Sequence, residues 1–362
     1  MKTGTRGAAV VMAAVALVLA LAACGGETGN GPGGGGGPTI GLLLPDAVTA
    51  RWETQDRPLF EQRIRALCDD CRVEHANADG SVAAQQQQVD VMITTGVDAL
   101  VLVAVNARSL STAVDKAAAA GIPVIAYDRL AEGPISGYVS FDGVQVGRLQ
   151  GTALLRAMGD RADGGQIVMM NGDPTDPNTA LFKEGALSVL DGRVRIGKSY
   201  DTYQWRTETA NANMSGAIAA LGPGNINGVY AANDSLAAGS ISALKANKVK
   251  PLPPVTGQDA ELGALRRIVG GDQYMTVYKP FGPEASAGAD MALAAARGEN
   301  LDRTAPDRVR ASDGQPVPAV MLTPVSVTAG TIKDTLVKDG VYTVRQICTP
   351  QLRAACHEVG LT

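Results

Sequence analysis

The sequence predicts an α/β protein with two similar lobes, each built around a parallel central sheet. From residue 39 onward, short apolar, β-branched runs alternate with longer amphipathic or alanine-rich stretches, an order typical of parallel strands joined by helical crossovers. Most of these runs are apolar throughout, as expected for strands buried on both faces. About ten runs are present, more than one typical sheet holds, so a chain of 362 residues is expected to divide into two lobes.

The expected elements follow one another in a regular order. Strands are expected over residues 40–44, 73–76, 99–103, 123–127, 138–141, 166–170, 194–199, 228–232, 254–257 and 274–278. The helices expected between them include residues 82–95, 109–120, 144–158, 207–221 and 235–246. No short internal repeat appears in this alternation.

Charge and composition exclude several classes of protein. The formal net charge is −4, and no helix-turn-helix precedes the first strand, so no nucleic-acid partner is expected. Hydrophobic residues make up 45% of the chain, which is enough for a packed core. There are only two histidines, His75 and His357, which leaves little for a metal site or a histidine-dependent catalytic triad. We therefore expect no metal, no cofactor and no catalytic residue.

The first segment has the features of an export signal. Lys2 and Arg6 precede an uncharged apolar run over residues 8–23, which is short for a membrane span. The run ends in Leu-Ala-Ala-Cys24, which resembles a bacterial lipobox and implies cleavage before Cys24 and lipid attachment to its sulfur. Residues 1–23 are then a signal peptide and residues 24–38 a glycine-rich tether, which holds an extracytoplasmic protein on the cell membrane. The alternative is ordinary secretion with an incidental cysteine.

Four further cysteines are expected to form disulfides, because an even count outside the cytoplasm favours them. Three pairings are possible, and the short separations favour Cys68–Cys71 and Cys348–Cys356. The Cys68-Asp-Asp-Cys71 segment could also be a redox or zinc motif. The flanking acids would raise the pKa of the thiols, which argues against redox chemistry, and a second close ligand pair for zinc is lacking. A structural disulfide is the favoured interpretation.

Polar side chains follow most of the expected strands. They are Asp46, Asp128, Arg129, Asp173, Asp176, Asn233, Asp234, Asp259 and Lys279. The carboxyl ends of strands in open α/β sheets line the ligand crevice, so these groups are expected to converge there. The alternative is that the Asp and Asn residues are helix N-caps, but N-caps do not account for Arg129 or Lys279, because cations oppose the helix dipole at an N-terminus. Acids, amides and cations together suit a neutral ligand rich in hydroxyl groups.

Both tryptophans lie close to expected strand ends. Trp52 follows the first strand and Trp205 follows the seventh, each in polar surroundings. An indole packs well on the apolar C–H face of a sugar ring, so both are expected to contact the ligand. The alternative is that both are core residues.

Several segments together resemble one protein family. They are Arg51-Trp52, Val124-Ile-Ala-Tyr-Asp-Arg129, Asn171-Gly-Asp-Pro174, Ala232-Asn-Asp234, Gly257-Gln-Asp-Ala260 and Met275-Thr-Val-Tyr-Lys-Pro280. On these segments the chain resembles the sugar-binding, type I periplasmic-binding-protein family, and within it the D-xylose-binding members of ABC transporters. The resemblance covers residues 39 to about 342.

The resemblance implies two Rossmann-like lobes joined by a three-segment hinge, with crossings near residues 140–142, 279–281 and 323–325. The N-terminal lobe would comprise residues 39–140 and 281–323, and the C-terminal lobe residues 141–280 and 324–362. It implies a monomer that captures a monosaccharide, most favourably D-xylose, and delivers it to an ABC transporter permease. The implied ligand-binding residues are Arg51, Trp52, Asp128, Arg129, Asn178, Trp205, Asn233, Asp259 and Lys279. Pro177 departs from the family pattern, in which a second Asn is common.

Two other functions are considered. A sugar-binding component of a chemosensory or signalling system would have the same sequence features. An exported glycoside hydrolase would need two carboxylates roughly 5–9.5 Å apart, for which Asp128 and Asp259 are the candidates. Arg129 and Lys279 are expected to keep both carboxylates ionised, which would leave no acid to protonate a leaving group.

Overall fold

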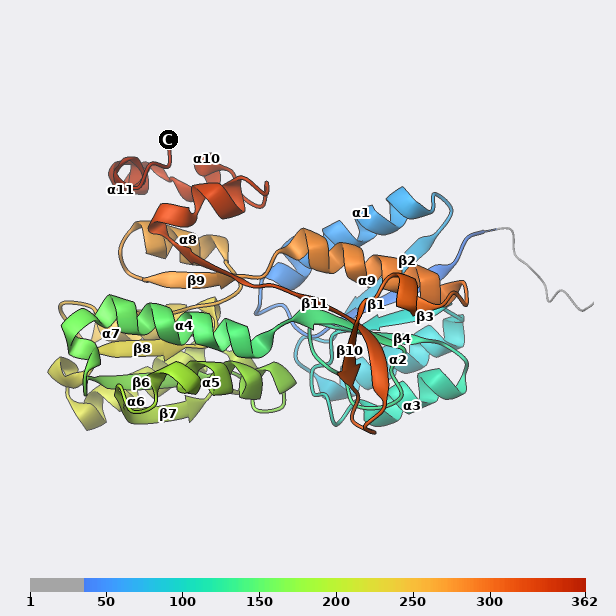
Figure 1. Ribbon diagram of the computed structural model, residues 1–362, viewed down its shortest axis with the longest axis horizontal. Coiled ribbons are helices and arrows are strands. Elements are labelled where there is room, and N and C mark those ends of the chain that lie inside the picture. The colour runs from blue at the N-terminus through green and yellow to red at the C-terminus, as the bar shows by residue number, and fades with distance from the viewer. Residues whose placement is uncertain (1–35) are drawn as a thin grey trace, which may run out of the picture. The chain divides into compact units, whose positions relative to one another are not determined.

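The computed structural model describes residues 36–362, so the expected signal peptide, Cys24 and most of the tether lie outside the described residues. The predicted α/β architecture is confirmed (Figure 1). One sheet has seven strands in the order β10-β11-β5-β4-β3-β1-β2. Its strands are β1 (Thr39–Leu44), β2 (Arg72–Asn77), β3 (Ala99–Leu102), β4 (Val124–Tyr127), β5 (Gly137–Phe141), β10 (Asp307–Arg310) and β11 (Pro316–Leu322). All neighbours in it pair in parallel except β10, which is antiparallel to β11.

The remaining strands form two smaller sheets. A parallel three-stranded sheet has the order β7-β6-β8, and β9 pairs with β12 in an antiparallel ribbon. These strands are β6 (Gln166–Asn171), β7 (Arg195–Asp201), β8 (Gly228–Ala231), β9 (Met275–Tyr278) and β12 (Val325–Thr328). A single parallel bridge joins Val229 of β8 to Val255. The second lobe therefore has a mostly parallel core with an antiparallel edge.

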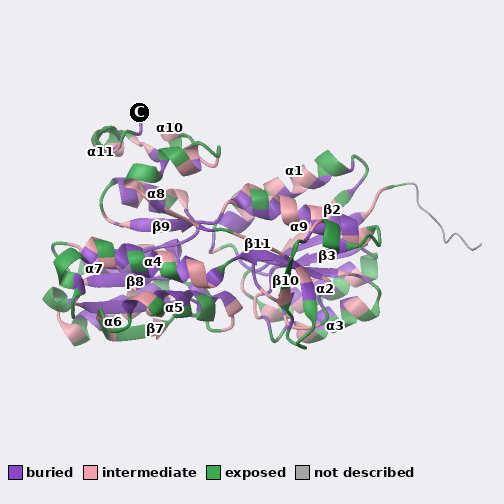
Figure 2. Cartoon of the chain, viewed as in Figure 1, coloured by how far each residue is buried: buried purple, intermediate pink, exposed green. Residues whose placement is uncertain are grey.

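Helices cover both faces of the seven-stranded sheet. Successive residues of a strand point to opposite faces, and β1 shows this directly: Leu42 packs in one core cluster and Leu43 in another. The first cluster lies under α1 (Arg57–Leu67) and α9 (Phe281–Ala296), and the second under α2 (Val82–Thr95) and α3 (Ser111–Ala119). Figure 2 shows the buried strands between helices whose outer faces are exposed.

The second lobe packs five helices around its strands. They are α4 (Gly143–Met158), α5 (Pro177–Leu190), α6 (Thr207–Leu221), α7 (Asp234–Ala246) and α8 (Leu262–Val269). Helices α4 and α5 approach so closely that only glycine fits at Gly147 and Gly185. A Cβ at Gly147 would lie 1.9 Å from the Phe182 carbonyl oxygen, and one at Gly185 would lie 1.9 Å from the Val144 carbonyl oxygen. This close contact fixes the start of α5, which carries two of the residues that line the site described below.

The chain passes between the two groups of strands three times. The passages run from β5 to α4, from β9 to α9, and from β11 to β12. Hereafter the N-lobe is the seven-stranded sheet with α1, α2, α3 and α9, and the C-lobe is the other two sheets with α4–α8 and the segment after β12.

Some expected strands are wrong. Residues 254–257 form no regular strand beyond the Val255 bridge, although their backbone bonds Val229 of β8 and Val277 of β9; Pro254 supplies no N–H donor for a longer ladder. Strands β10, β11 and β12 were not expected; β11 is apolar throughout, but it contains two prolines, which are uncommon within strands. Strand β7 is mostly exposed rather than buried on both faces, because it is the edge strand of its sheet.

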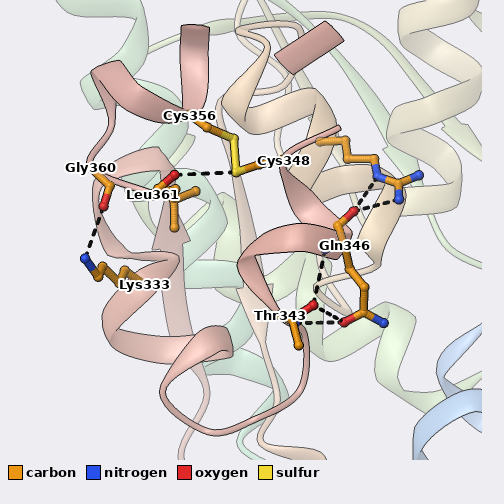
Figure 3. The surroundings of a disulfide bond; sticks show 8 residues. Lys333, Thr343, Gln346, Cys348, Cys356, Gly360 and Leu361 are labelled. Atoms are coloured by element: carbon orange, nitrogen blue, oxygen red, sulfur yellow. Dashed lines mark hydrogen bonds between the residues drawn. A yellow bond between two sulfur atoms is a disulfide. The ribbon is translucent and has the colours of Figure 1, made fainter. Parts of the chain in front are cut away.

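The C-terminal segment folds onto α8 as a compact cap. It contains a π-helical turn (Lys333–Val337), α10 (Val344–Ile347) and α11 (Arg353–Glu358), and its apolar side chains pack with those of α8 and β9. The structure pairs Cys348 with Cys356 across this cap, where Lys333 also donates to the Gly360 carbonyl (Figure 3). Cys68 pairs with Cys71 between α1 and β2. These are the pairings that the short separations favour.

Within residues 36–362, no helix combines the length and the apolar character needed to cross a membrane.

Candidate ligand-binding site

A small cavity lies between the two lobes, at the carboxyl ends of their parallel strands, and about 20 Å³ of it is open to the centre of a water-sized sphere. The N-lobe lines it with Thr49, Trp52, Asp128 and Arg129, and the C-lobe with Asp176, Asn178, Phe182, Trp205, Asn233, Gln258, Asp259 and Lys279. Eight of the nine expected ligand-binding residues line this cavity, and Arg51 does not.

Asp128 is bonded from both lobes. It follows β4 with a φ of 58°, a left-handed conformation that is uncommon for a residue with a side chain. Its Oδ2 accepts hydrogen bonds from Lys279 Nζ at 2.8 Å and from Arg51 Nη1 at 3.2 Å, and its Oδ1 accepts one from Asn178 Nδ2 at 2.9 Å. Burial opposes ionisation, but Lys279 and Arg51 outweigh it and lower the pKa of Asp128 to about 2. Asp128 is therefore a fixed carboxylate.

Arg129 and Asp176 form a second link between the lobes. Arg129 Nε lies 2.7 Å from Asp176 Oδ2, and Arg129 Nη1 donates to the Ala104 carbonyl at 3.1 Å. Asp176 is the N-cap of α5 and also accepts a hydrogen bond from Trp205 Nε1 at 3.3 Å. Burial raises the pKa of Asp176 to about 6 despite the neighbouring Arg129. One residue thus acts both as a helix cap and as part of the cavity wall.

The helix-cap alternative accounts for several of the other polar residues at strand ends. Asn233 caps α7 through its Oδ1, which accepts from Leu236 N, and it still lines the cavity. Asp173 accepts from the backbone of Thr175 and of Gln204 and does not line the cavity. Asp234 is buried against Gln273 and Thr276, also outside the cavity. The expectation that polar residues after strands line the ligand crevice therefore selects too many residues. Some of them, such as Asp173 and Asp234, bond neighbouring groups and do not line the cavity.

Four buried polar atoms of the cavity residues have no hydrogen-bond partner among the described residues. Arg129 Nε is ion-paired with Asp176, which leaves Asp259 Oδ1, Gln258 Oε1 and Trp52 Nε1. Asp259 Oδ1 lies 3.5 Å from Lys279 Nζ and 3.8 Å from Arg51 Nη1 without a hydrogen bond to either. The backbone of Asp259 has a φ of 92°, which, as at Asp128, is a strained conformation for a residue with a side chain. Buried polar groups are normally paired, so two acceptors and a donor in one cavity indicate a polar ligand.

Both tryptophans are buried yet line the cavity. The guanidinium of Arg51 lies over the Trp52 ring, 4.5 Å from its centroid, which leaves the rest of the indole for other contacts. Trp205 follows Gln204, and both have φ values near 55°. Its ring lies so close to Gly172 that a Cβ there would be 2.0 Å from the indole. The loop and this glycine together fix the position of Trp205.

Four cavity residues were not among the expected ligand-binding residues: Thr49, Asp176, Phe182 and Gln258. Asp176 is among the polar residues that follow expected strands, but it was not predicted to contact the ligand. Gln258 is the neighbour of Asp259 and could have been found by the same rule. Thr49 and Phe182 carry no such signal, because only the approach of the two lobes brings them to the cavity.

A two-lobed α/β fold that encloses one small polar cavity between its lobes defines a solute-binding protein. Residues 40–300 match the family model described as "Periplasmic binding protein domain", and the chain belongs to this family. Proteins of this family bind solutes and are not enzymes, so the hydrolase alternative is excluded.

Several known proteins are similar to this chain over most of its length. The D-xylose-binding periplasmic protein of Haemophilus influenzae is 35% identical over 315 residues, which cover 85% of this chain and 91% of that protein. The multiple sugar-binding periplasmic protein SbpA of Azospirillum brasilense is 32% identical, covering 85% and 91%. The crystal structure of an ABC transporter solute-binding protein from Clostridium phytofermentans with bound β-D-glucose has a TM-score of 0.79 and 29% identity, covering 85% of this chain and 99% of that one.

Proposed function

We propose that this protein captures a monosaccharide between its two lobes, D-xylose before other sugars, and delivers it to the permease of an ABC transporter. The observation that carries the proposal is the small cavity in which buried acceptors and a donor have no protein partner. A sugar supplies both hydroxyl donors for Asp259 and Gln258 and an acceptor for the Trp52 N–H. No bond is made or broken in this function.

Binding and closure are linked in this proposal. Groups of both lobes contribute to one cavity, so a sugar that bonds both lobes favours the closed arrangement over an open one. Asp128 and Arg129 already form bonds across the boundary, with Lys279, Asn178 and Asp176. These contacts between the lobes stabilise the closed form in addition to the bonds that the sugar makes. The permease would then receive the closed protein.

D-xylose is the favoured ligand for two reasons. A relative of 35% identity is named as a D-xylose-binding protein, and the cavity is small. Other relatives are named for several sugars or contain glucose, so the choice among aldoses is part of the proposal. A pocket discriminates one extra hydroxymethyl group only through the contacts that exclude it.

Isothermal titration calorimetry with a panel of pentoses and hexoses tests this function. We expect D-xylose to bind most tightly and Asp259→Ala to weaken its binding by about tenfold or more, since a hydrogen bond to a charged group contributes ~1.5–3 kcal/mol. Asp115→Ala is the matched control, because Asp115 is exposed on α3, away from the cavity. Binding of no sugar, or unchanged binding by Asp259→Ala, would contradict the proposal.

We also propose that the mature protein begins at a lipid-modified Cys24 and is anchored as a monomer on the outer side of the cell membrane. Support comes from the basic start, the apolar run and the Leu-Ala-Ala-Cys24 ending. Mass spectrometry of the N-terminal peptide should show a diacylated cysteine, and Cys24→Ser should release the protein from membranes. Wild-type protein that is already unmodified and free in the medium would contradict the anchor.

A further inference from the structure

Asp173 is one of the polar residues that follow an expected strand, and the proposed function assigns it no role. It is buried, and it lies in the loop between β6 and α5. Its Oδ1 accepts hydrogen bonds from Thr175 N at 2.7 Å and from Thr175 Oγ1 at 2.6 Å, and its Oδ2 accepts one from Gln204 N at 2.5 Å. Both carboxylate oxygens are therefore bonded by the protein itself, and Asp173 ties together two loops of the C-lobe.

The two loops that Asp173 joins follow the neighbouring strands β6 and β7. Thr175 lies in the loop between β6 and α5, and Gln204 lies in the 3-10 turn Tyr203–Trp205 between β7 and α6. Gln204 has a φ of 55°, which is a strained conformation for a residue with a side chain. A hydrogen bond to a carboxylate is stronger than one between neutral groups, so the bond from the Gln204 N–H to Asp173 holds this turn in place.

Each of the two loops also makes a hydrogen bond to the N-lobe. Ala107 N donates to the Thr175 carbonyl at 3.4 Å, and Gln204 Nε2 donates to the Gly80 carbonyl at 3.3 Å. Ala107 lies between β3 and α3, and Gly80 lies between β2 and α2. The two bonds therefore connect the lobes through loops that follow the carboxyl ends of strands.

The groups that form these bonds are fixed within their own lobes. Gly80 N donates to the Pro45 carbonyl at 2.8 Å in the N-lobe. In the C-lobe, Arg206 Nε donates to Gln204 Oε1 at 2.8 Å, which leaves the amide nitrogen of Gln204 to face Gly80. Each bond between the lobes is long and joins neutral groups, so it contributes little alone. Because Asp173 holds both loops, we expect the two bonds to form and break together.

Resting on the proposed function, we infer that Asp173 is a positioning residue, which holds the Thr175 and Gln204 loops as a single latch on the N-lobe and thereby slows the release of the sugar. The latch comprises Asp173, Thr175 and Gln204 with their contacts to Ala107 and Gly80. Opening of the lobes must break both contacts, whereas the first encounter of the sugar with the open form does not involve them. The latch therefore acts on dissociation more than on association.

The first test measures the rates of D-xylose binding by stopped-flow tryptophan fluorescence. Asp173→Ala releases both loops, so we expect the dissociation rate to rise on the order of 10-fold and the association rate to change much less. Asp313→Ala is the matched control. Asp313 Oδ1 accepts a hydrogen bond from Gln315 N at 2.9 Å, with the same spacing as Asp173 and Thr175, but in the turn between β10 and β11. An unchanged dissociation rate in Asp173→Ala, or an equal rise in Asp313→Ala, would overturn the inference.

A double variant tests whether Asp173 acts through Gln204. Asp173→Asn keeps one acceptor oxygen for Thr175 but presents an N–H donor to Gln204 N, so it should break only the bond to Gln204. We therefore expect Gln204→Ala to raise the dissociation rate a few-fold in the wild type and hardly at all in the Asp173→Asn protein. Effects that multiply would show that Asp173 acts independently of Gln204, as a direct bond to the sugar would, and this result would also overturn the inference.

Amide hydrogen exchange, followed by NMR with and without D-xylose, measures the latch itself. The Ala107 amide should be protected in the wild type, and Asp173→Ala should raise its exchange rate about 3- to 10-fold. The Val103 amide, which donates to the Leu43 carbonyl at 3.0 Å within the N-lobe, should not change.

Three results of the exchange experiment would overturn the inference: an Ala107 amide that is unprotected under both conditions, protection that Asp173→Ala leaves intact, or equal rises at Ala107 and Val103. A rise confined to Ala107, in a protein that binds no sugar, would support the latch and overturn only the proposed function.

Discussion

The two lobes hold their binding groups in different ways. In the N-lobe, Asp128 and Arg129 are held by ion pairs, with Arg51 at 3.2 Å and Asp46 at 3.7 Å respectively. In the C-lobe, Asn233 caps α7 and Asn178 lies in the first turn of α5 beside its cap, Asp176. One half of the site is therefore fixed by charge and the other half largely by helix N-termini.

This difference has consequences for energy and for pH. Breaking a buried ion pair leaves an uncompensated charge and costs ~3–5 kcal/mol, whereas loss of a helix cap costs ~0.5–2 kcal/mol. The Asn233 cap is a neutral amide and does not titrate, whereas the pKa of the Asp176 cap is raised to about 6 by burial. The N-lobe half should therefore be the more sensitive of the two to mutation, while both lobes respond to pH.

The largest expected effect is that of removing the central carboxylate. Asp128→Ala leaves Lys279 and Arg51 without a shared partner, so we expect the free energy of unfolding to fall by ~3–5 kcal/mol. Asn233→Ala should cost only about 1 kcal/mol. Urea denaturation measures both, with Asp115→Ala as the neutral control. Equal costs for Asp128→Ala and Asn233→Ala would remove the distinction between the lobes.

The two disulfides allow a second comparison, of similar bonds in different lobes. Cys348–Cys356 closes a loop with a sequence separation of 8, and Cys68–Cys71 one with a separation of 3. In the chain-entropy description these loops contribute about 2.5 and about 1.6 kcal/mol. Replacing each pair by serines should lower the melting temperature more for the C-terminal pair. The reverse order would show that local contacts, rather than loop length, decide the contribution.

The pH dependence of stability comes from buried acids in both lobes. Burial raises the pKa of Glu284 to about 8 in the N-lobe, and of Asp234 to about 7 and Glu261 to about 8 in the C-lobe. A raised pKa of an acid means that the folded protein holds the proton more tightly than the unfolded chain does. The associated stability is fully present below about pH 4 and is lost as the pH rises through 7–8.

We therefore expect the free energy of unfolding to fall by at least ~1 kcal/mol between pH 5 and pH 9. Glu284→Gln should remove the N-lobe share of this dependence and Glu261→Gln the C-lobe share. Denaturant titrations at several pH values measure it. A stability that rises over this range, or a slope unchanged by both substitutions, would contradict the expectation.

The smallest expected effect concerns an exposed contact between the two lobes. Gln204, beside Trp205 in the C-lobe, donates to the Gly80 carbonyl of the N-lobe at 3.3 Å in an exposed position. Its loss in Gln204→Ala should cost ~0.5–1.5 kcal/mol of the closed form and raise the sugar dissociation rate a few-fold. Stopped-flow tryptophan fluorescence measures this rate. A larger change in the association rate than in dissociation would mean that Gln204 acts before closure.

Much of the site follows from a rule that needs no long-range information. Asp128, Arg129, Asn233 and Lys279 follow strands whose apolar runs are plain in the sequence, and all four line the cavity. Asp259 also lines it, although the segment before it makes only a bridge. The rule also selects Asp173 and Asp234, because a strand end looks the same whether its side chain faces the cavity or bonds the local backbone.

The last three strands show where the same reasoning stops. Strands β10, β11 and β12 lie in a region with several prolines and charges, and none of them is buried throughout, although β11 pairs in parallel with β5. Their pairing with β5 and β9 depends on partners far away in the chain. The pattern of apolar and polar residues within a segment does not show with which distant strand it pairs.

By itself, the sequence determined the α/β class, the division into two lobes and most of the polar groups at the strand ends, because these depend on local patterns of apolar and polar residues. Only the tertiary structure decided which of those groups meet in one cavity and which atoms are left without partners. Arg51 is the plainest case: it bonds Glu284, 233 residues away, and also approaches the cavity carboxylates of Asp128 and Asp259. The physical reason is that the partners of a charged group are chosen by packing, which no short segment encodes.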